Sequence, residues 1–164
     1  MSTSFSAEEM FEMAERIERN GATFYRTAAK GVSDASVRRR LGELAAWEDE
    51  HERTFAAMRA ELTVEECTPT AFDPDAQSTL YLVAMADRRV FDVSLEPGQL
   101  LTGKETLAQI LQAALGREKD SVVFYTGMLD YVPKRLGKDR IEGIIREEMG
   151  HIALLGKELG ALKP

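Results

Sequence analysis

The stretches EDEH at residues 48–51 and EMGH at residues 148–151 each place a histidine three residues after a glutamate. These two histidines are the only ones among the 164 residues of the chain. Residues i and i+3 of an α-helix project side by side and lie about 4.5 Å apart along the axis. The two stretches therefore predict two helices on which a carboxylate and an imidazole can bind the same metal ion.

A shift of 100 residues aligns the first half of the chain with the second half. Four matches define this repeat: Glu18 with Glu118, FY at 24–25 with FY at 124–125, Glu48 with Glu148, and His51 with His151. Since both halves contain the same elements in the same order, the chain is expected to use one helical hairpin twice.

Four segments have apolar residues at spacings of three and four, which is typical of amphipathic helices. The predicted helices cover about residues 7–31, 34–62, 104–131 and 134–160. Asp34 is expected to cap the second helix, and Pro133 separates the last two. The methionines and the following residues are expected in the core: Phe11, Ala14, Ile17, Gly21, Phe24, Tyr25, Leu41, Leu44, Phe55, Met58, Leu107, Leu111, Ala114, Val122, Phe124, Tyr125, Leu129, Ile141, Ile144, Ile152, Leu155 and Leu159.

The segment 63–103 interrupts the helical pattern with three prolines and contains one short apolar stretch, 79–86, that is expected to form a short helix. Some forty residues are too many for a simple turn, so this segment is expected to cross over along the bundle. The helix at 104–131 then runs parallel to the helix at 34–62. The predicted fold class is all-α: a single domain, residues 1–164, forming a four-helix bundle of two hairpins with a long crossover between them.

A glutamate from each of two helices, together with Glu-x-x-His from each of the other two, is the ligand set of di-metal carboxylate bundles. Glu18 and Glu118 complete that set here. All four glutamates lie near the midpoints of their predicted helices. If the second and third helices are parallel, a pseudo-two-fold axis perpendicular to the bundle relates the two hairpins. Only residues at the middle of the bundle then meet their equivalents in the other hairpin. One central site shared by both halves is therefore expected.

Four carboxylates inside an apolar bundle repel one another and lose hydration, so some of them are expected to be protonated without metal. Two divalent cations would offset the four negative charges. The mixture of oxygen and nitrogen ligands suits iron or manganese and also accepts zinc.

The acidic composition excludes several partners. The net charge is −7, the isoelectric point is near 5.0, and the one basic run is at 38–40, so nucleic acid is not an expected partner. No apolar run approaches the roughly 20 residues that span a bilayer, and the N-terminus lacks the pattern of a signal peptide. A cytoplasmic location away from membranes is expected. The single cysteine, Cys67, excludes an intramolecular disulfide.

These residues together resemble the rubrerythrin branch of the ferritin-like superfamily. The string IERNGATFY at 17–25, the two Glu-x-x-His motifs, and Glu118 with Tyr125 carry the resemblance, which spans about residues 7–62 and 104–161. It implies a di-iron site that reacts in the diferrous state with hydrogen peroxide or dioxygen and is then reduced again. By this resemblance the iron ligands are Glu18 and His51 for one ion, Glu118 and His151 for the other, and Glu48 and Glu148 as bridges.

Several residues beside these ligands have two possible roles. Tyr25 and Tyr125 follow their glutamates by seven residues, which suits hydrogen bonds to ligand carboxylates across the bundle, and either core filling or a catalytic role is open. Trp47 could lie on an electron path or pack against a neighbouring helix. Glu50 and Glu147 are expected on a solvated face.

The sequence departs from rubrerythrins in two places and from bacterioferritin in a third. Cys67 alone cannot form the four-cysteine iron site of rubredoxin, so an external electron-donor protein is expected. Leu115 and Ser121 occupy the positions one turn before and after Glu118, where rubrerythrins carry an extra glutamate. Asp49 stands where bacterioferritin has a haem-binding methionine, so no haem is expected.

Three functions remain open from the sequence. The first is a rubrerythrin-type oxidoreductase that acts on hydrogen peroxide or dioxygen. The second is a ferroxidase or iron-storage protein with ferrous iron as its substrate, and the third is a non-catalytic bundle that metal, such as zinc, holds together. A homodimer or higher homo-oligomer is expected, and exchange of hairpins between chains remains open.

Overall fold

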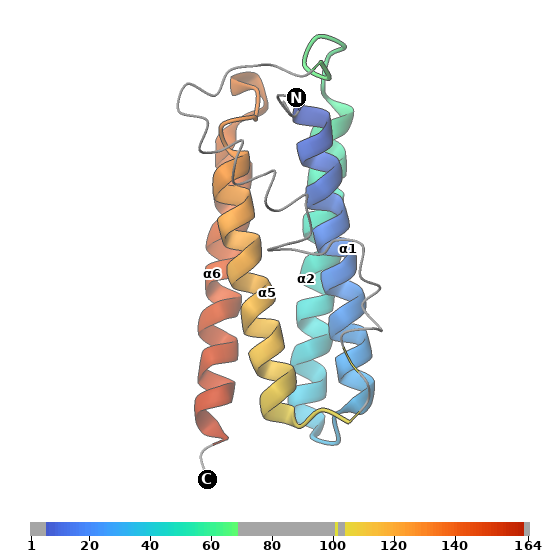
Figure 1. The fold of residues 1–164 in the computed structure, drawn as a ribbon, viewed down its shortest axis with the longest axis vertical. Coiled ribbons are helices and arrows are strands. Elements are labelled where there is room, and N and C mark those ends of the chain that lie inside the picture. The colour runs from blue at the N-terminus through green and yellow to red at the C-terminus, as the bar shows by residue number, and fades with distance from the viewer. Residues whose placement is uncertain (1–5, 69–100, 102–103, 163–164) are drawn as a thin grey trace, which may run out of the picture.

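Four long helices make up the described part of the chain, which comprises residues 6–68, 101 and 104–162 of the computed structural model. The elements are α1 (Ala7–Gly31), α2 (Ala35–Ala60), α5 (Leu107–Met128), the 3-10 turn η1 (Lys134–Leu136) and α6 (Lys138–Ala161). Together they form an all-α four-helix bundle (Figure 1).

The helices are arranged as two antiparallel hairpins, α1 with α2 and α5 with α6 (Figure 1). α2 and α5 run in the same direction, as the long connection between them predicts. The expected short helix at 79–86 lies outside the described residues.

Polar caps fix the starts of three helices. Ser6 and Glu9 form a capping box at α1, and Thr106 and Gln109 form another at α5. The Asp34 carboxylate accepts hydrogen bonds from the first backbone N–H groups of α2 at 2.8 and 3.0 Å, as its predicted capping role requires.

Four helix ends differ from the prediction by two or more residues. α5 begins at Leu107 instead of 104, because Thr106 is its N-cap, and it ends at Met128 instead of 131. α2 ends at Ala60 instead of 62, because the chain tightens there into hydrogen bonds between residues three apart. The last helix does not begin directly after Pro133.

Gly137 causes this late start. Its φ of 75° is a left-handed conformation that favours glycine, and it ends the 3-10 turn that follows Pro133. α6 therefore begins at Lys138 and continues to Ala161.

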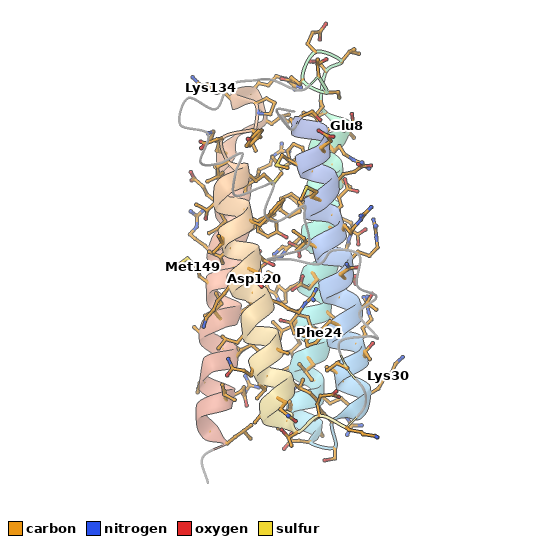
Figure 2. All side chains as sticks on the ribbon, viewed as in Figure 1. Glu8, Phe24, Lys30, Asp120, Lys134 and Met149 are labelled. Carbon is orange, nitrogen blue, oxygen red and sulfur yellow. The ribbon has the colours of Figure 1, made fainter. Side chains whose placement is uncertain are left out.

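Two apolar clusters fill the bundle on either side of its middle. The cluster nearer the start of α1 contains Met10, Phe11, Ala14, Ile17, Phe55, Met58, Phe124, Tyr125, Met128, Val132, Leu136, Ile141 and Ile144. The other contains Phe24, Tyr25, Ala28, Val32, Val37, Leu41, Leu44, Ala45, Leu101, Ile110, Leu111, Ala114 and Leu155. Phe24 points into the space between the helices, whereas Lys30 and Met149 point away from it (Figure 2).

The core prediction needs correction at its edges. Met149 is 56% exposed, so not all methionines lie in the core. Six of the expected core residues are only half-buried: Met13, Leu107, Val122, Leu129, Ile152 and Leu159. Among the described helices, none is both long and apolar enough to cross a membrane.

Candidate metal centre

Six buried polar side chains lie between the two apolar clusters. They come from all four helices and are at most 8% exposed: Glu18, Glu48, His51, Glu118, Glu148 and His151. These are the six residues that the sequence predicts at one level of the bundle. Because burying ionisable groups without partners is costly, the arrangement of their atoms decides what the layer can hold.

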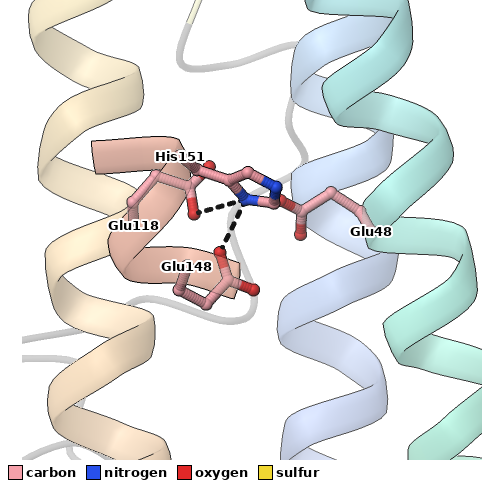
Figure 3. A group of neighbouring side chains, drawn as sticks. All are labelled: Glu48, Glu118, Glu148 and His151. Atoms are coloured by element: carbon pink, nitrogen blue, oxygen red, sulfur yellow. Dashed lines mark hydrogen bonds and ion pairs between the residues drawn. The ribbon is translucent and has the colours of Figure 1, made fainter. Parts of the chain in front are cut away.

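The six residues form two groups that share Glu148. In one group, His51 Nδ1 lies 2.8 Å from Glu148 Oε1 and 3.5 Å from Glu18 Oε2. In the other, His151 Nδ1 lies 3.0 Å from Glu148 Oε2 and 3.6 Å from Glu118 Oε2 (Figure 3). Each oxygen of Glu148 thus faces a different histidine.

Glu48 belongs to the second group. It faces the His151 side of the layer (Figure 3), and one potential ligand atom from each of Glu48, Glu118, Glu148 and His151 lies within 4.8 Å of all the others. Glu18, His51 and Glu148 meet the same criterion in the first group. Each half of the layer therefore offers a compact set of oxygen and nitrogen donors.

Unpartnered atoms converge in the first group. Glu18 Oε2, His51 Nδ1 and Glu148 Oε1 are buried and lack hydrogen bonds of acceptable direction, although Nδ1 and Oε1 are close enough for one. A buried polar atom without a partner costs about 1–3 kcal/mol. Three such atoms around one point fit a cation, which would satisfy them together.

Burial and repulsion from neighbouring carboxylates shift Glu48 and Glu118 toward their protonated forms. Burial, followed by the charges of Glu18 and Glu118, raises the pKa of Glu48 well above its usual range. Burial and the hydrogen bond with Glu148 raise the pKa of Glu118 to about 8, against the opposing effect of His151. Some of these carboxyl groups therefore hold protons when no metal is bound, as the charge argument predicts.

The pKa values of both histidines are raised, which favours their positively charged forms. Burial alone would lower the pKa of both, but the nearby carboxylates of Glu148 and Glu18 raise the pKa of His51 to about 11. Interactions with Glu118 and Glu148 raise the pKa of His151 to about 9. Burial opposes ionisation of Glu148, yet its polar contacts with Glu118 and the two histidines lower its pKa. Protons on the histidines thus provide the positive charge that metal ions would otherwise supply.

Two tyrosines cross the bundle to hold the terminal glutamates. Tyr25 Oη on α1 donates a hydrogen bond to Glu118 Oε1 on α5, and Tyr125 Oη on α5 donates one to Glu18 Oε1 on α1. Burial and the neighbouring carboxylates raise the pKa of both tyrosines well above the usual value, so they remain neutral donors. Each bond occupies Oε1 and leaves Oε2 facing a histidine.

Gly21 provides the space for Glu48. A Cβ atom on Gly21 would overlap the Glu48 carboxyl group, at 2.9 Å from its Cδ. The corresponding residue of the second repeat is Ser121, which is buried. Of the two positions one turn from Glu118, this one therefore holds a small polar side chain and no carboxylate.

Glu147 makes a contact with a histidine of the centre that the sequence does not predict. The Glu147 side chain was expected on a solvated face, and it is 45% exposed. Its Oε2 atom nevertheless lies 2.8 Å from Nε2 of His51. Glu50, by contrast, is exposed and pairs with Arg53, as expected of a surface residue. The contact of Glu147 depends on the register between α2 and α6, which spacing within one helix does not reveal.

Trp47 packs against the other histidine. Its ring centroid lies 6.0 Å from that of His151 on α6 in an edge-on arrangement, and 6.4 Å from that of His51. The side chain is also 47% exposed, so the expected packing against a neighbouring helix is present together with contact to solvent.

Comparison with known proteins identifies the fold. No protein-family model matches this chain, and no curated protein matches its sequence. The structure is similar to the crystal structure of a protein from Thermotoga maritima that carries the description ferritin-like diiron-carboxylate protein. The TM-score is 0.70, the sequence identity is 21%, and the match covers 96% of each chain. The chain therefore has a ferritin-like fold, and its buried carboxylate and histidine layer supports a centre for two metal ions.

Proposed function

We propose that this protein is a di-iron-binding oxidoreductase of rubrerythrin type, which reacts with hydrogen peroxide or dioxygen. The observation that carries the proposal is the sharing of Glu148 between two groups of ligand atoms. A carboxylate whose two oxygens face two different cation positions is the arrangement that a two-metal centre needs.

The ligand roles are those that the resemblance to rubrerythrins implies, and the two groups support all of them except bridging by Glu48, which lies in the second group. Glu18 and His51 would hold one iron ion, Glu118 and His151 the other, and Glu48 and Glu148 would bridge them. Iron suits this mixture of carboxylate and imidazole donors, whereas zinc and manganese are possible substitutes. The bound iron would supply electrons to the oxidant, and an external electron-donor protein would restore them.

The remaining residues prepare the site. Tyr25 and Tyr125 orient the Glu118 and Glu18 carboxylates through their hydrogen bonds. The apolar clusters above and below the layer exclude water, which strengthens the electrostatic attraction between the carboxylates and cations. Binding would release the protons that the carboxyl groups and histidines hold without metal.

Stopped-flow absorbance tests the proposal. The full chain is loaded anaerobically with ferrous iron, mixed with hydrogen peroxide, and followed for ferric absorption and for peroxide loss. We expect both signals at two iron ions per chain. Absence of ferric absorption and of peroxide loss would remove the proposal. Zinc at two per chain in protein from its native source, without a redox response, would favour the non-catalytic bundle.

Ser121 favours a second candidate, a ferroxidase that oxidises ferrous iron with dioxygen. Neither Ser121 nor Leu115, the residues one turn after and before Glu118, supplies the additional carboxylate of the rubrerythrin pattern, so the two halves of the layer are more alike than in that pattern. Continued oxidation of ferrous iron added in excess would support this activity. Sedimentation would show whether the assembly is large enough to enclose stored iron, because a dimer cannot.

A further inference from the structure

The two histidines of the metal centre have different neighbours on their outer sides. Glu147 and Trp47 occupy equivalent positions of the internal repeat, 100 residues apart. Because α2 and α6 lie antiparallel, Glu147 faces His51 and Trp47 faces His151. The repeat therefore places a carboxylate behind one histidine and an indole behind the other.

Glu147 holds His51 from behind. Its Oε2 lies 2.8 Å from Nε2 of His51, while Nδ1 of the same ring points to Glu18 and Glu148. A carboxylate that accepts the Nε2–H bond fixes the tautomer whose Nδ1 lone pair is free for a metal ion, and it also fixes the ring orientation. Such partners typically change metal affinity by about 10–100-fold.

His151 lacks this support. Within the described residues its ion pairs, with Glu118 and Glu148, are both made through Nδ1. Trp47 packs edge-on against this ring, with centroids 6.0 Å apart and an interplanar angle of 69°, and its centroid also lies 6.4 Å from that of the His51 ring. Packing limits the movement of the ring, but an indole provides no charged acceptor for its N–H group.

We propose that Glu147 is a positioning residue that selectively strengthens metal binding in the half of the centre formed by Glu18 and His51. The inference rests on the proposed two-metal function and deepens it by making the two halves unequal. Trp47 marks the half in which this support is missing. Exchange of the residues at these two positions should therefore move the support from one histidine to the other.

Cobalt(II) binding to the full chain tests this role without relying on activity. Metal-free wild-type protein and Glu147→Ala are titrated, with calorimetry for affinity and visible absorption for coordination. We expect two ions per wild-type chain and a loss of about 10–100-fold in affinity for one of them in Glu147→Ala. Glu50→Ala removes an exposed glutamate next to His51 and should change neither affinity.

Combined variants identify the half that is affected. In His151→Ala, which retains the His51 half, adding Glu147→Ala should weaken the remaining ion. In His51→Ala, the same addition should have no effect. Equal weakening in both backgrounds, or in neither, would overturn the inference.

A spectroscopic signature separates positioning from general stabilisation. In zinc-loaded, 15N-labelled protein, the hydrogen-bonded Nε2–H proton of His51 should give a downfield signal that Glu147→Ala removes and Glu50→Ala retains. The far-ultraviolet circular dichroism of the three proteins should agree. An unchanged His51 signal in Glu147→Ala would contradict the hydrogen bond on which the inference depends.

A gain of binding provides the converse test. Trp47→Glu places a carboxylate opposite His151 and should tighten the ion of that half, whereas Trp47→Phe retains an aromatic ring and should not. Failure of the wild-type protein to bind two ions would reject the proposed function itself. Normal binding of two ions that Glu147→Ala leaves unchanged would reject only the positioning role.

Discussion

Glu148 on α6 places its Oε1 atom 2.8 Å from Nδ1 of His51 on α2. Its second oxygen lies 3.0 Å from Nδ1 of His151, which follows it by one helical turn. One side chain thus contacts the histidines of both repeats. A bridging ligand has this property, and its removal should have a different effect from removal of either histidine.

Metal stoichiometry should separate the bridge from the terminal ligands. We expect Glu148→Ala to impair binding of both ions, because each of its oxygens belongs to a different group. His51→Ala and His151→Ala should each weaken one ion more than the other. Equilibrium dialysis with metal analysis measures the two losses. Loss of a single ion in all three variants would contradict the shared role.

Gly21→Ala should weaken metal binding by displacing the Glu48 side chain. The new Cβ would overlap the Glu48 carboxyl group, so this side chain must leave its position and metal binding should weaken. Alanine is otherwise preferred over glycine inside a helix by about 1 kcal/mol. The expected result is weaker metal binding without the stability gain that this preference would give.

Gly116→Ala is the matched control for that substitution. It lies within α5, and nothing lies within 4 Å of the Cβ atom that it would gain. We therefore expect a gain of about 0.5–1 kcal/mol in the free energy of unfolding and unchanged metal binding. Urea denaturation and metal titration of both variants measure the contrast. Equal behaviour of the two variants would show that Gly21 does not make room for Glu48.

The pKa shifts predict that the metal-free protein loses stability as pH rises. The Glu118 carboxyl normally ionises near pH 4.5, but in the folded protein its pKa is about 8. The folded state therefore holds an extra proton between these values, and the free energy of unfolding falls with pH. His151, with a pKa raised from 6.5 to about 9, and His51, raised to about 11, act in the same direction. The lowered pKa of Glu148 contributes stability above pH 4.5 and does not change the sign in this window.

Urea denaturation at pH 5, 7 and 9, in the presence of a chelator, measures this dependence. Each extra proton held by the folded state contributes a slope of roughly 1.4 kcal/mol per pH unit. Metal-loaded protein should show a smaller slope because the ions replace the protons. Stability of the metal-free protein that is constant or rises from pH 5 to 9 would contradict the shifts.

The helices, and the positions of the ligand residues along each helix, could be predicted from the sequence. The spacing of apolar residues predicts all four helices, and the offset of three between glutamate and histidine places both groups on one face. The internal repeat then brings Glu18 and Glu118 to the same level. These features depend on positions within one helix, or on a symmetry that the sequence itself contains.

Features that depend on packing between helices could not be predicted in the same way. The contact of Glu147 with His51 requires the register of α6 against α2, which the side chains of both helices set together. The start of α5 depends on the capping box of Thr106 and Gln109. This pattern is present in the sequence, but the residues just before Thr106 also favour a helix, so the sequence does not fix the first residue of α5. Met149 has an apolar side chain on a face that no described helix covers.

Replacement of Tyr25 or Tyr125 by phenylalanine should lower the free energy of unfolding, and for the same reason in both cases. Tyr25→Phe removes the hydroxyl that donates to Glu118, and Tyr125→Phe removes the one that donates to Glu18. Each substitution leaves a buried carboxyl oxygen without its donor, which costs about 1–3 kcal/mol. Because the repeat makes the two contacts equivalent, the two losses should be similar and serve as controls for each other. Thermal and urea denaturation of metal-free protein measure them, and a loss below about 0.5 kcal/mol in both variants would show that the hydroxyl groups do not hold the glutamates. The reaction of the iron-loaded variants with peroxide should persist at a reduced rate, because phenylalanine still fills the core but no longer fixes the carboxylate that holds the ion.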